Sequence, residues 1–231
     1  MTIKLWDLAG AEDDRRFSPH CWRIKMALRH KGLDVEEIPW RFTEKDAIAA
    51  SGQGAVPVIE DQGQTLYDSW TIANYLDEAY PDRPLLFSGE EGKALTFFLK
   101  HWIERTLHAP FLRLIVLDIE KHLHDKDRKY FRESREKRLG KTLEAFAGDR
   151  DAALAALRGA LDPLRPVLAG SAFLAGRSPG FADYLLIAEF QWARAVSPVK
   201  LLEADDPICA WRERVMDLFG GYAGKAVGYP V

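Results

Sequence analysis

The residues whose types and spacing best suit chemistry lie in the run Phe-Ser-Pro-His-Cys-Trp-Arg at positions 17–23. Within this run, Ser18 and Cys21 have the spacing of the redox motif Cys-Pro-x-Cys, with serine in place of the leading nucleophile. A serine cannot exchange disulfides, but its hydroxyl can donate a hydrogen bond to a thiolate that another molecule supplies. If a helix begins at Ser18, the helix dipole favours the same anion. The run therefore predicts a thiolate-binding site.

Such a site would change the ionisation of the bound thiol. A free thiol has a pKa near 8.5, and helix N-termini with nearby donors lower thiol pKa values to roughly 3.5–7.5. A fall of about two pKa units corresponds to about 2.7 kcal/mol in favour of the anion. The simpler interpretation is that Ser18 only caps a helix whose first position is Pro19, where no amide donor is needed. Taken alone, the dipeptide favours this structural role.

The first part of the chain must position this run, and its pattern predicts alternating strands and helices. A buried strand at 3–8 leads into a polar loop, and apolar residues at i, i+3 and i+7 from Cys21 predict a helix from Ser18 to about Gly32. The elements expected after it are a strand at 35–40, a weaker helix or loop at 43–54, a hairpin of strands at 56–60 and 65–68, and a helix at 72–79. This β-α-β-(α)-β-β-α order is thioredoxin-like.

Beyond the proline-containing segment at 81–84, the sequence shows helical periodicity only. We therefore predict a thioredoxin-like α/β domain at 1–82 and an all-α helical bundle at 90–231. Pro110 should kink or end its helix because it removes a backbone donor. One apolar face of that helix would consist of Leu95, Phe98, Trp102 and Ile103, and further helices should begin near Lys126, Ala152, Phe181 and Pro207.

Composition and charge exclude several classes of protein. The 231 residues, 47% hydrophobic and 29% charged, have the make-up of an ordinary globular protein. The net charge of -3 gives no general attraction for nucleic acid, and the interleaved charges at 125–141 predict a solvated helix face rather than a phosphate-binding patch. No run of about 18 apolar residues predicts a membrane span, and no N-terminal apolar segment signals export. We expect a cytoplasmic protein that binds neither nucleic acid nor membrane.

The cysteines and histidines predict neither a disulfide framework nor a metal site. Only Cys21 and Cys209 are present, which fits a reducing compartment. His122 and His124 are two positions apart, so they would not share a helix face, and no metal is predicted.

From residue 1 to about residue 230, the chain resembles the cytosolic glutathione transferase superfamily, in which a helical domain follows a thioredoxin-like domain. Ser18 matches the serine that activates glutathione in serine-type members. The segment Gly-Ala-Val-Pro-Val-Ile at 54–59 resembles the family's segment with a cis-proline before a strand. The resemblance implies that the Val56-Pro57 bond is cis and that the Val56 backbone pairs with the cysteinyl backbone of glutathione like an added strand.

Two further elements resemble the family's motifs. Asp68 and Ser69 match its acidic-Ser-x-x-Ile element, which implies that Ser69 and the helix amides receive the γ-glutamyl carboxylate while Asp68 faces the ammonium group of glutathione. On its own, Asp-Ser before an apolar helix is more often only a cap. The Phe-Ala-Asp-Tyr run at 181–184 resembles the family's structural motif, in which Asp183 would accept backbone donors. Gly180 stands where Ser or Thr is expected, so we expect a weaker cap.

Within the superfamily, the run at 17–23 and Leu-Tyr-Asp-Ser-Trp at 66–70 look most like the bacterial β-etherase and fungal etherase-like branch. Members of that branch use glutathione thiolate to cleave β-aryl ethers of lignin-derived compounds. The resemblance implies glutathione as co-substrate, a small hydrophobic and aromatic electrophile, and a homodimer. Trp102, Phe111 and Trp192 could line the electrophile's pocket between the domains, although their helical spacing favours core positions.

Two other functions stay open at this point. A non-catalytic glutathione- or ligand-binding protein on the same fold would show the same binding features. Cys21 could instead be the nucleophile of a glutathione-dependent oxidoreductase, although its place on the apolar face with Ile24 and Leu28 favours a buried thiol. Arg23 and Arg41 could assist binding, but isolated arginines are usually surface residues, and we leave both out of the candidate site.

Overall fold

The N-terminal part contains a four-stranded sheet with the strand order β2-β1-β3-β4. The structure is a computed structural model that describes residues 2–230. β1 (Ile3–Leu8) pairs parallel with β2 (Val35–Trp40) and antiparallel with β3 (Val58–Asp61), and β3 pairs antiparallel with β4 (Gln64–Tyr67). This mixed sheet, with one helix after β1 and another after β4, confirms the predicted thioredoxin-like fold.

The two helices beside the sheet begin at residues whose side chains satisfy free backbone N–H groups, and α1 also ends at a capping glycine. α1 (Pro19–Lys31) has Ser18 as its N-cap and ends at Gly32, which adopts the left-handed conformation with φ of 63°. α2 (Ser69–Ala79) begins after Asp68, whose carboxylate accepts two backbone N–H groups of the helix. Both helices therefore start at residues of the predicted site.

Between β2 and β3, where the sequence predicts a weak helix or a loop, the chain forms the short 3₁₀ helix η1 (Lys45–Ser51). Residues 56–57, predicted as the start of a strand, precede β3 instead. Pro57 has no N–H group to donate to a strand ladder, which explains the later start. Val56 therefore lies outside the paired part of the sheet.

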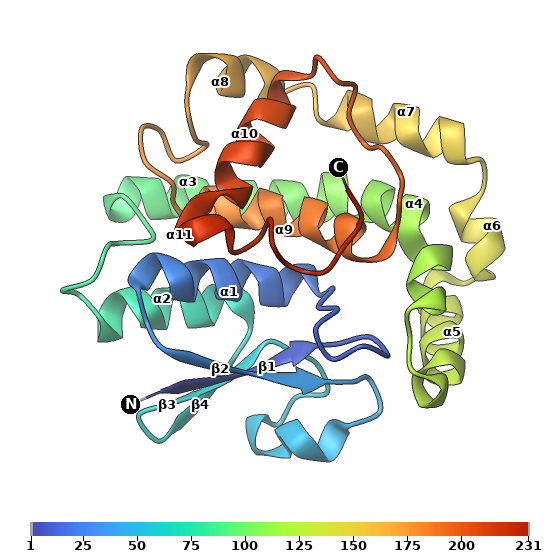
Figure 1. Cartoon of the computed structure of the whole chain (residues 1–231), viewed down its shortest axis with the longest axis horizontal. Coiled ribbons are helices and arrows are strands. Elements are labelled where there is room, and N and C mark those ends of the chain that lie inside the picture. The colour runs from blue at the N-terminus through green and yellow to red at the C-terminus, as the bar shows by residue number, and fades with distance from the viewer. Residues whose placement is uncertain (1, 231) are drawn as a thin grey trace.

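After a linker at 80–88, the chain is helical, as predicted. Most of these helices lie above the layer of α1 and α2 in Figure 1. No helix within residues 2–230 combines the length and apolar character needed to cross a membrane. The division into domains at 1–82 and 90–231 stays a prediction. The helices are α3 (Gly89–Trp102), α4 (His108–Lys121), α5 (Asp125–Leu139), α6 (Leu143–Ala147), α7 (Arg150–Ala160), α8 (Leu164–Gly170), α9 (Phe181–Val196), α10 (Pro207–Met216) and α11 (Leu218–Gly221).

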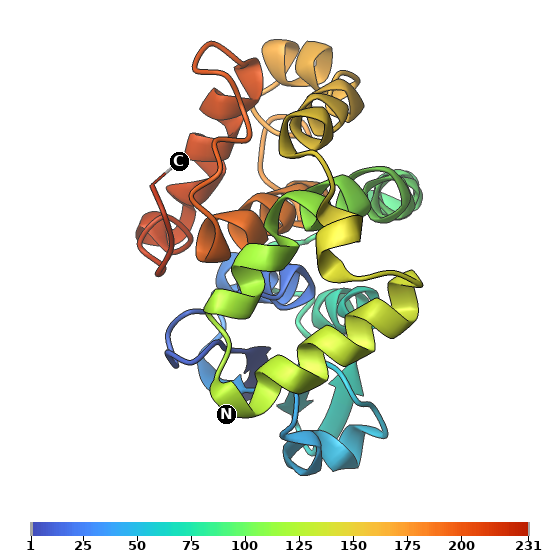
Figure 2. The same ribbon diagram turned by 90° about the vertical axis from the view of Figure 1, so that its right-hand side faces the viewer.

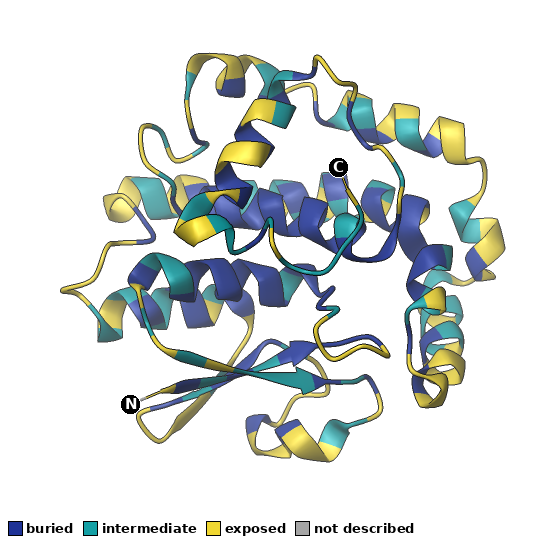
Figure 3. Cartoon of the chain, viewed as in Figure 1, coloured by how far each residue is buried: buried dark blue, intermediate teal, exposed yellow. Residues whose placement is uncertain are grey.

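α9 occupies the centre of the molecule, and all of its residues except Arg194 are buried. α1 packs against it, and Figure 3 shows both helices largely in the colour of buried residues. α1, which Ser18 caps, is thus held between the sheet and the helical layer. This support on two sides fixes the position of the α1 N-terminus.

Pro110 does not end its helix, but a π-helical turn interrupts the α-helical hydrogen bonding just before it. α3 continues through a π-helical turn, η2 (Ile103–Leu107), directly into α4, and Pro110 lies in the first turn of α4. The wider turn before it accommodates a residue that cannot donate a helical hydrogen bond. The predicted apolar face is also only partly buried, because Leu95 and Phe98 are 71% and 70% exposed while Ile103 is buried.

Asp183 organises the start of α9, as the resemblance implies. Its carboxylate accepts the backbone N–H groups of Gly180 at 3.1 Å, Leu174 at 2.7 Å and Ala175 at 3.3 Å, and the indole N–H of Trp211 at 2.8 Å. Gly180 supplies no side-chain cap, as expected. A Cβ atom at this position would lie 2.8 Å from the Cβ atom of Ala175, so the close approach of the preceding loop requires glycine.

Candidate active site

Ser18 lies at the N-terminus of α1 and is only 5% exposed. Its Oγ accepts the backbone N–H of Cys21 at 3.2 Å, so the hydroxyl caps the helix through an oxygen lone pair. The hydroxyl donates no hydrogen bond to any other residue of the described chain. Because a hydroxyl has one donor hydrogen as well as two lone pairs, capping leaves that hydrogen for an incoming anion. The cap and the thiolate donor are therefore compatible roles of the same group.

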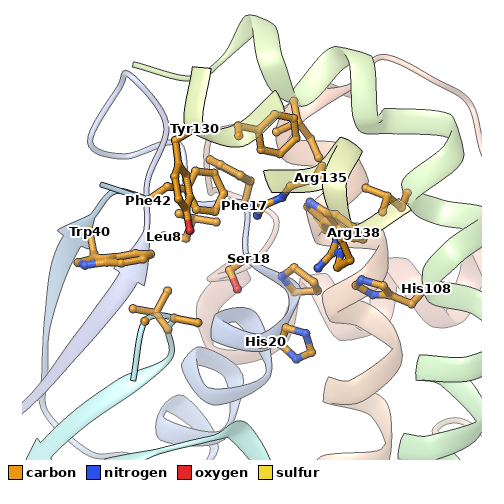
Figure 4. A pocket seen from close by; sticks show the side chains of 18 of the residues that line it. Leu8, Phe17, Ser18, His20, Trp40, Phe42, His108, Tyr130, Arg135 and Arg138 are labelled. Atoms are coloured by element: carbon orange, nitrogen blue, oxygen red, sulfur yellow. The ribbon is translucent and has the colours of Figure 1, made fainter. Parts of the chain in front are cut away.

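A cavity of about 370 Å³ opens in front of Ser18. One wall is aromatic, with Trp40 and Phe42 from the end of β2 and the loop after it, and Tyr130 from α5. The other side contains His108 of α4, and Figure 4 shows Ser18 between these two sides. The volume and the aromatic lining suit a small aromatic molecule.

A second cavity, of about 260 Å³, adjoins the first and shares three lining residues with it. Val56, Pro57, Asp68 and Ser69 all line this second cavity. The fold thus brings together the four residues that the resemblance implies for glutathione, beside the cavity that contains Ser18. The Val56-Pro57 peptide bond is cis, as the resemblance also implies.

The start of α2 offers groups for both a carboxylate and an ammonium ion. Asp68 has φ of 65° and ψ of 126°, and a non-glycine residue with such positive φ stores about 1–3 kcal/mol of strain, typically at a functional site. Its Oδ1 accepts the N–H groups of Trp70 and Thr71, both at 3.0 Å, which leaves Oδ2 for a ligand. Ser69 is 2% exposed at the first position of the helix, where free amides favour an anion.

His20 lines both cavities and is held in its neutral form. Burial lowers its pKa well below the ordinary value of 6.5, and the positive charge of Arg23 and the nearby His108 act in the same direction. A histidine with so low a pKa is a weak base at neutral pH. A thiolate here would therefore be stabilised by hydrogen-bond donors rather than formed by proton transfer to His20.

Cys21 is completely buried within α1. Burial raises the pKa of its thiol well above 9.0, and the negative charge of Asp7 raises it further. Reactive cysteines need a lowered pKa and access to the reaction partner. The structure thus supports the interpretation of Cys21 as a buried thiol and weighs against a Cys21-dependent oxidoreductase.

Part of the cavity wall comes from residues 125–141, whose interleaved charges predict a solvated helix face. Tyr130, Phe131, Arg135 and Arg138 of α5 all line the cavity. The sequence indicates this role only through residue spacing. Phe131, Arg135 and Arg138 are related as i, i+4 and i+7, so they share one helix face. A charged helix with an aromatic residue and two arginines on one face can cover a binding site with that face and expose its other faces to solvent.

α5 is attached to the N-terminal part of the chain near this wall. Oδ1 of Asp127 accepts the backbone N–H of Thr43 at 3.0 Å and its hydroxyl at 2.7 Å. Lys126 Nζ lies 2.7 Å from Glu44 Oε1. In Figure 2, α5 crosses in front of the sheet. These contacts join α5, which supplies part of the cavity wall, to the segment after β2.

Of the three aromatic candidates on the helical side, Trp192 lines the cavity. Its ring stacks on His108, with centroids 4.8 Å apart and planes at 21°. Phe111 is a fully buried core residue that packs edge-on against Phe190 at 5.3 Å, and Trp102 is half-buried outside the cavity lining. His108 belongs to no motif, and nothing in the sequence alone indicates its place in the wall.

Arg23 is not a surface residue, contrary to expectation. It is completely buried, with Nη1 2.7 Å from Glu104 Oε1 and Nη2 3.2 Å from Glu189 Oε1. Arg41 donates from Nε to the carbonyl of Gly10 at 3.0 Å and so supports the loop after β1. Neither arginine lines either cavity.

The histidines at the end of α4 have structural contacts. His122 Nε2 lies 3.2 Å from the hydroxyl of Tyr229, and His124 caps α5. Across residues 2–230, no group of three or more His, Cys, Asp or Glu side chains is arranged to hold a metal ion.

The chain combines a thioredoxin-like sheet with a helix N-terminus that a hydroxyl group caps, and the helices that follow complete an aromatic cavity. Proteins of this class can bind a thiol beside an apolar molecule. Sequence models described as "Glutathione S-transferase, N-terminal domain" and "Glutathione S-transferase, C-terminal domain" match residues 14–84 and 94–213. The chain belongs to the glutathione S-transferase family, as its sequence predicts, and glutathione is the ligand that membership indicates.

Individual relatives agree with this assignment. Glutathione S-transferase-like protein ustS of Aspergillus flavus is 28% identical over 243 residues, covering 90% of this chain and 81% of that protein. Glutathione S-transferase U7 of Arabidopsis thaliana is 24% identical over 178 residues, covering 76% of this chain and 66% of that protein. A crystal structure of the glutathione S-transferase CsGST63524 of Ceriporiopsis subvermispora in complex with glutathione has a TM-score of 0.83 at 22% identity, covering 96% of this chain and 98% of that one. This last similarity confirms the fold.

Proposed function

We propose that this protein is a glutathione transferase that holds the glutathione thiolate against Ser18 and directs it at a small aromatic electrophile. The observation that carries the proposal is the state of the Ser18 hydroxyl. It accepts the N–H of Cys21 at 3.2 Å, donates to no other residue in the described chain, and lines the cavity. The dipole of α1 favours the same negative charge. Both effects stabilise the thiolate relative to the thiol.

The adjoining cavity supports a position for the rest of glutathione. The backbone of Val56, next to Pro57 and outside the sheet ladder, would pair with the cysteinyl backbone of glutathione. Ser69 and the first amides of α2 would receive the γ-glutamyl carboxylate, and Oδ2 of Asp68 would face its ammonium group. In this position the sulfur extends toward Ser18 and the first cavity.

The reaction is a displacement at carbon. The thiol releases its proton to solvent on binding, and the thiolate sulfur then attacks the carbon that bears the leaving group. The S–C bond forms as the bond to the leaving group breaks, and the bonding electron pair departs with that group, so no oxidant or reductant is needed. Trp40, Phe42 and Tyr130 supply aromatic surface for the electrophile. Holding both reactants in adjoining cavities lowers the entropic part of the barrier.

A β-aryl ether is a specific candidate for this electrophile. The aromatic side chains of the cavity suit its rings, and the runs at 17–23 and 66–70 resemble the etherase-like branch. The leaving group would be an aryloxide, so the products are a glutathione thioether and, after protonation, a phenol. Release of phenol from a β-aryl ether dimer, compared with conjugation of an aryl halide, distinguishes an etherase from a general transferase.

Two experiments test the proposed function. In a crystal structure with glutathione soaked in, the sulfur should lie within about 2.7–3.5 Å, or slightly farther, of the Ser18 hydroxyl. A sulfur closer to Cys21 would overturn the assignment. Turnover with aryl halides and β-aryl ethers tests catalysis, because a thiolate absorbance signal without product from any of these electrophiles would identify a non-catalytic binding protein.

We further propose that the protein forms a homodimer through α3 and β4. Leu95 and Phe98 are 71% and 70% exposed, and Phe97 and Tyr67 are 43% and 42% exposed. The Phe97 ring lies 4.9 Å from that of Trp70 in the first turn of α2, so α3 packs against the start of the helix that follows β4. Exposed apolar surface of this kind marks interaction sites, and a second copy is the partner that the family resemblance implies. Analytical ultracentrifugation should give twice the 26.2 kDa of the chain, and Phe98→Glu should give the monomer.

A further inference from the structure

The cavity in front of Ser18 is positively charged on the side of α5. Its lining includes Lys45, Arg135 and Arg138 but no aspartate or glutamate. Within residues 2–230, neither arginine has a carboxylate within ion-pair distance. Two cations at the wall of an aromatic cavity are thus left without a counter-charge from the protein.

The outer face of the same helix shows the contrast. Arg132 lies 2.7 Å from Glu120, 3.1 Å from Glu136 and 2.9 Å from Glu144. The cation that points away from the cavity therefore has three carboxylate partners, whereas Arg135 has none in the described chain. This difference indicates that the positive charge on the inner face is available to a ligand.

Arg135 is well placed to bind an anion. Its guanidinium carbon lies 4.5 Å from the ring centroid of Phe42 and 4.8 Å from that of Phe131, so two aromatic faces hold the group in place. Its side chain makes one hydrogen bond in the described chain, from Nη1 to Ser134 Oγ at 2.9 Å, and the other N–H donors are left for a ligand. Burial and the charge of Arg138 lower the pKa of Arg135 to about 10, so the group stays charged at neutral pH.

We propose that the electrophile is an aromatic carboxylic acid whose carboxylate binds Arg135, with Arg138 beside it. A planar guanidinium matches a carboxylate with two parallel hydrogen bonds, and the ring of the same molecule would lie against Phe42 and Tyr130. Figure 4 shows Ser18 and Arg135 as separate parts of one cavity wall, so the anionic group and the reacting carbon occupy different places in it. This inference rests on the proposed function and names the substrate class of the same site.

A carboxylate of glutathione is the competing occupant. The residues proposed for glutathione line the second cavity, which includes neither Arg135 nor Arg138. Lys45 donates to the carbonyl of Gly54, next to the Val56 segment, and so supplies a cation close to the glutathione side. Arg135 is therefore available to the second substrate.

The test compares two electrophiles that differ in charge, a chloronitrobenzoate and the chloronitrobenzamide with the same substitution pattern. The wild-type protein should have the higher kcat/KM for the acid. Arg135→Met should lower the acid-to-amide ratio of kcat/KM by about tenfold to a hundredfold, the range of a charge-assisted hydrogen-bonded pair. Arg135→Lys retains the charge but not the planar fork, so it should restore part of the ratio. Lys129→Met removes the same charge from an 85% exposed position on α5 and should leave the ratio unchanged.

Two outcomes would overturn the proposal. One is a wild-type preference for the amide. The other is an unchanged acid-to-amide ratio in Arg135→Met, which together with a rise in the KM of glutathione would assign Arg135 to glutathione. Calorimetry with nitrobenzoate and nitrobenzamide measures binding without turnover. The protein could bind nitrobenzoate, lose this binding in Arg135→Met, and yet convert no electrophile. That result would support the anion site and contradict the proposed function.

Discussion

The imidazole of His108, on the cavity wall, has its Nδ1 atom 3.1 Å from Oε2 of Glu189, a completely buried carboxylate on α9. The other oxygen of Glu189 lies 3.2 Å from Arg23 on α1, and Arg23 also reaches Glu104. Trp192 stacks on the His108 ring from the side. One buried carboxylate therefore orients a cavity residue and joins α1, which begins at the proposed thiolate site, to the helical part.

We expect Glu189→Gln to lower the free energy of unfolding by about 3–5 kcal/mol, because removing one partner of a buried ion pair leaves the other charge buried without full compensation. Arg23 would keep only Glu104, which is partly exposed. Urea unfolding measures the change. Asp125→Asn is the matched control, since it breaks an exposed pair with Arg128 and should cost at most about 1 kcal/mol. Equal losses in the two variants would show that the buried pair contributes no more than a surface pair.

Ser18→Ala should raise the pKa of the bound glutathione thiol by about one to two units, the effect of losing one hydrogen bond to a charged group. The near-ultraviolet absorbance of the thiolate as a function of pH measures this shift directly. Ser18→Thr keeps both the hydroxyl and the cap, so it should retain most of the thiolate. Cys21→Ala should leave the thiolate pKa unchanged. The Ser18 assignment is wrong if Cys21→Ala abolishes glutathione-dependent disulfide reduction while Ser18→Ala retains it.

Acidification should destabilise the protein below pH 6.5. Burial lowers the pKa of His20 well below 6.5, and burial likewise lowers the pKa values of His30 and His122. Below pH 6.5 the unfolded chain binds protons that the folded protein does not, so the free energy of unfolding falls as the pH falls, by up to about 1.4 kcal/mol per pH unit for each histidine. Urea unfolding between about pH 7 and 5 should show this slope, and His20→Gln should reduce it. A flat profile would contradict the pKa assignments.

Much of the fold follows from local sequence. Ser18-Pro19 and Gly32 mark the two ends of α1, and the apolar residues between them indicate its buried face, so the helix is predicted almost to the residue. Pro110 shows the limit of such rules. Whether a proline breaks a helix depends on the preceding turn, and the π-helical turn of η2 lets the helix continue.

The candidate site is predictable only in part, for a physical reason. Val56, Pro57, Asp68 and Ser69 belong to short motifs at the ends of elements, where backbone geometry decides the contacts. Arg135 and His108 instead reach the cavity because α5 and α4 pack across it. That placement depends on long-range contacts such as the one between Asp127 and Thr43, which no local pattern encodes.

Gly180→Ser should destabilise the protein by about 1–3 kcal/mol, although serine is the residue expected at a helix N-cap. The new Cβ atom would lie 2.8 Å from that of Ala175, and the overlap outweighs the gain of a capping hydroxyl. Gly159→Ala is the opposite case, since a Cβ atom in this α7 position meets nothing within 4 Å and should stabilise by about 0.5–1 kcal/mol. Thermal unfolding of both variants measures the contrast, and a more stable Gly180→Ser variant would show that the loop can move aside.

Asp127→Ala should weaken binding of the electrophile more than binding of glutathione. Asp127 accepts two hydrogen bonds from Thr43 and so holds α5, with its cavity residues, against the loop after β2. Without them the α5 wall can move away from the cavity, while the proposed glutathione residues on β3 and α2 keep their support.

The expected result for Asp127→Ala is a rise in the KM of the electrophile of at least about fivefold, the effect of losing roughly 1 kcal/mol of positioning energy. A double-mutant cycle with Thr43→Val should give a coupling energy of about 0.5–3 kcal/mol in urea unfolding. Asp125→Ala, in the first turn of the same helix at an 87% exposed position, is the control and should change neither value. Equal changes in the KM values of both substrates would mean that α5 supports the whole site rather than the electrophile's cavity.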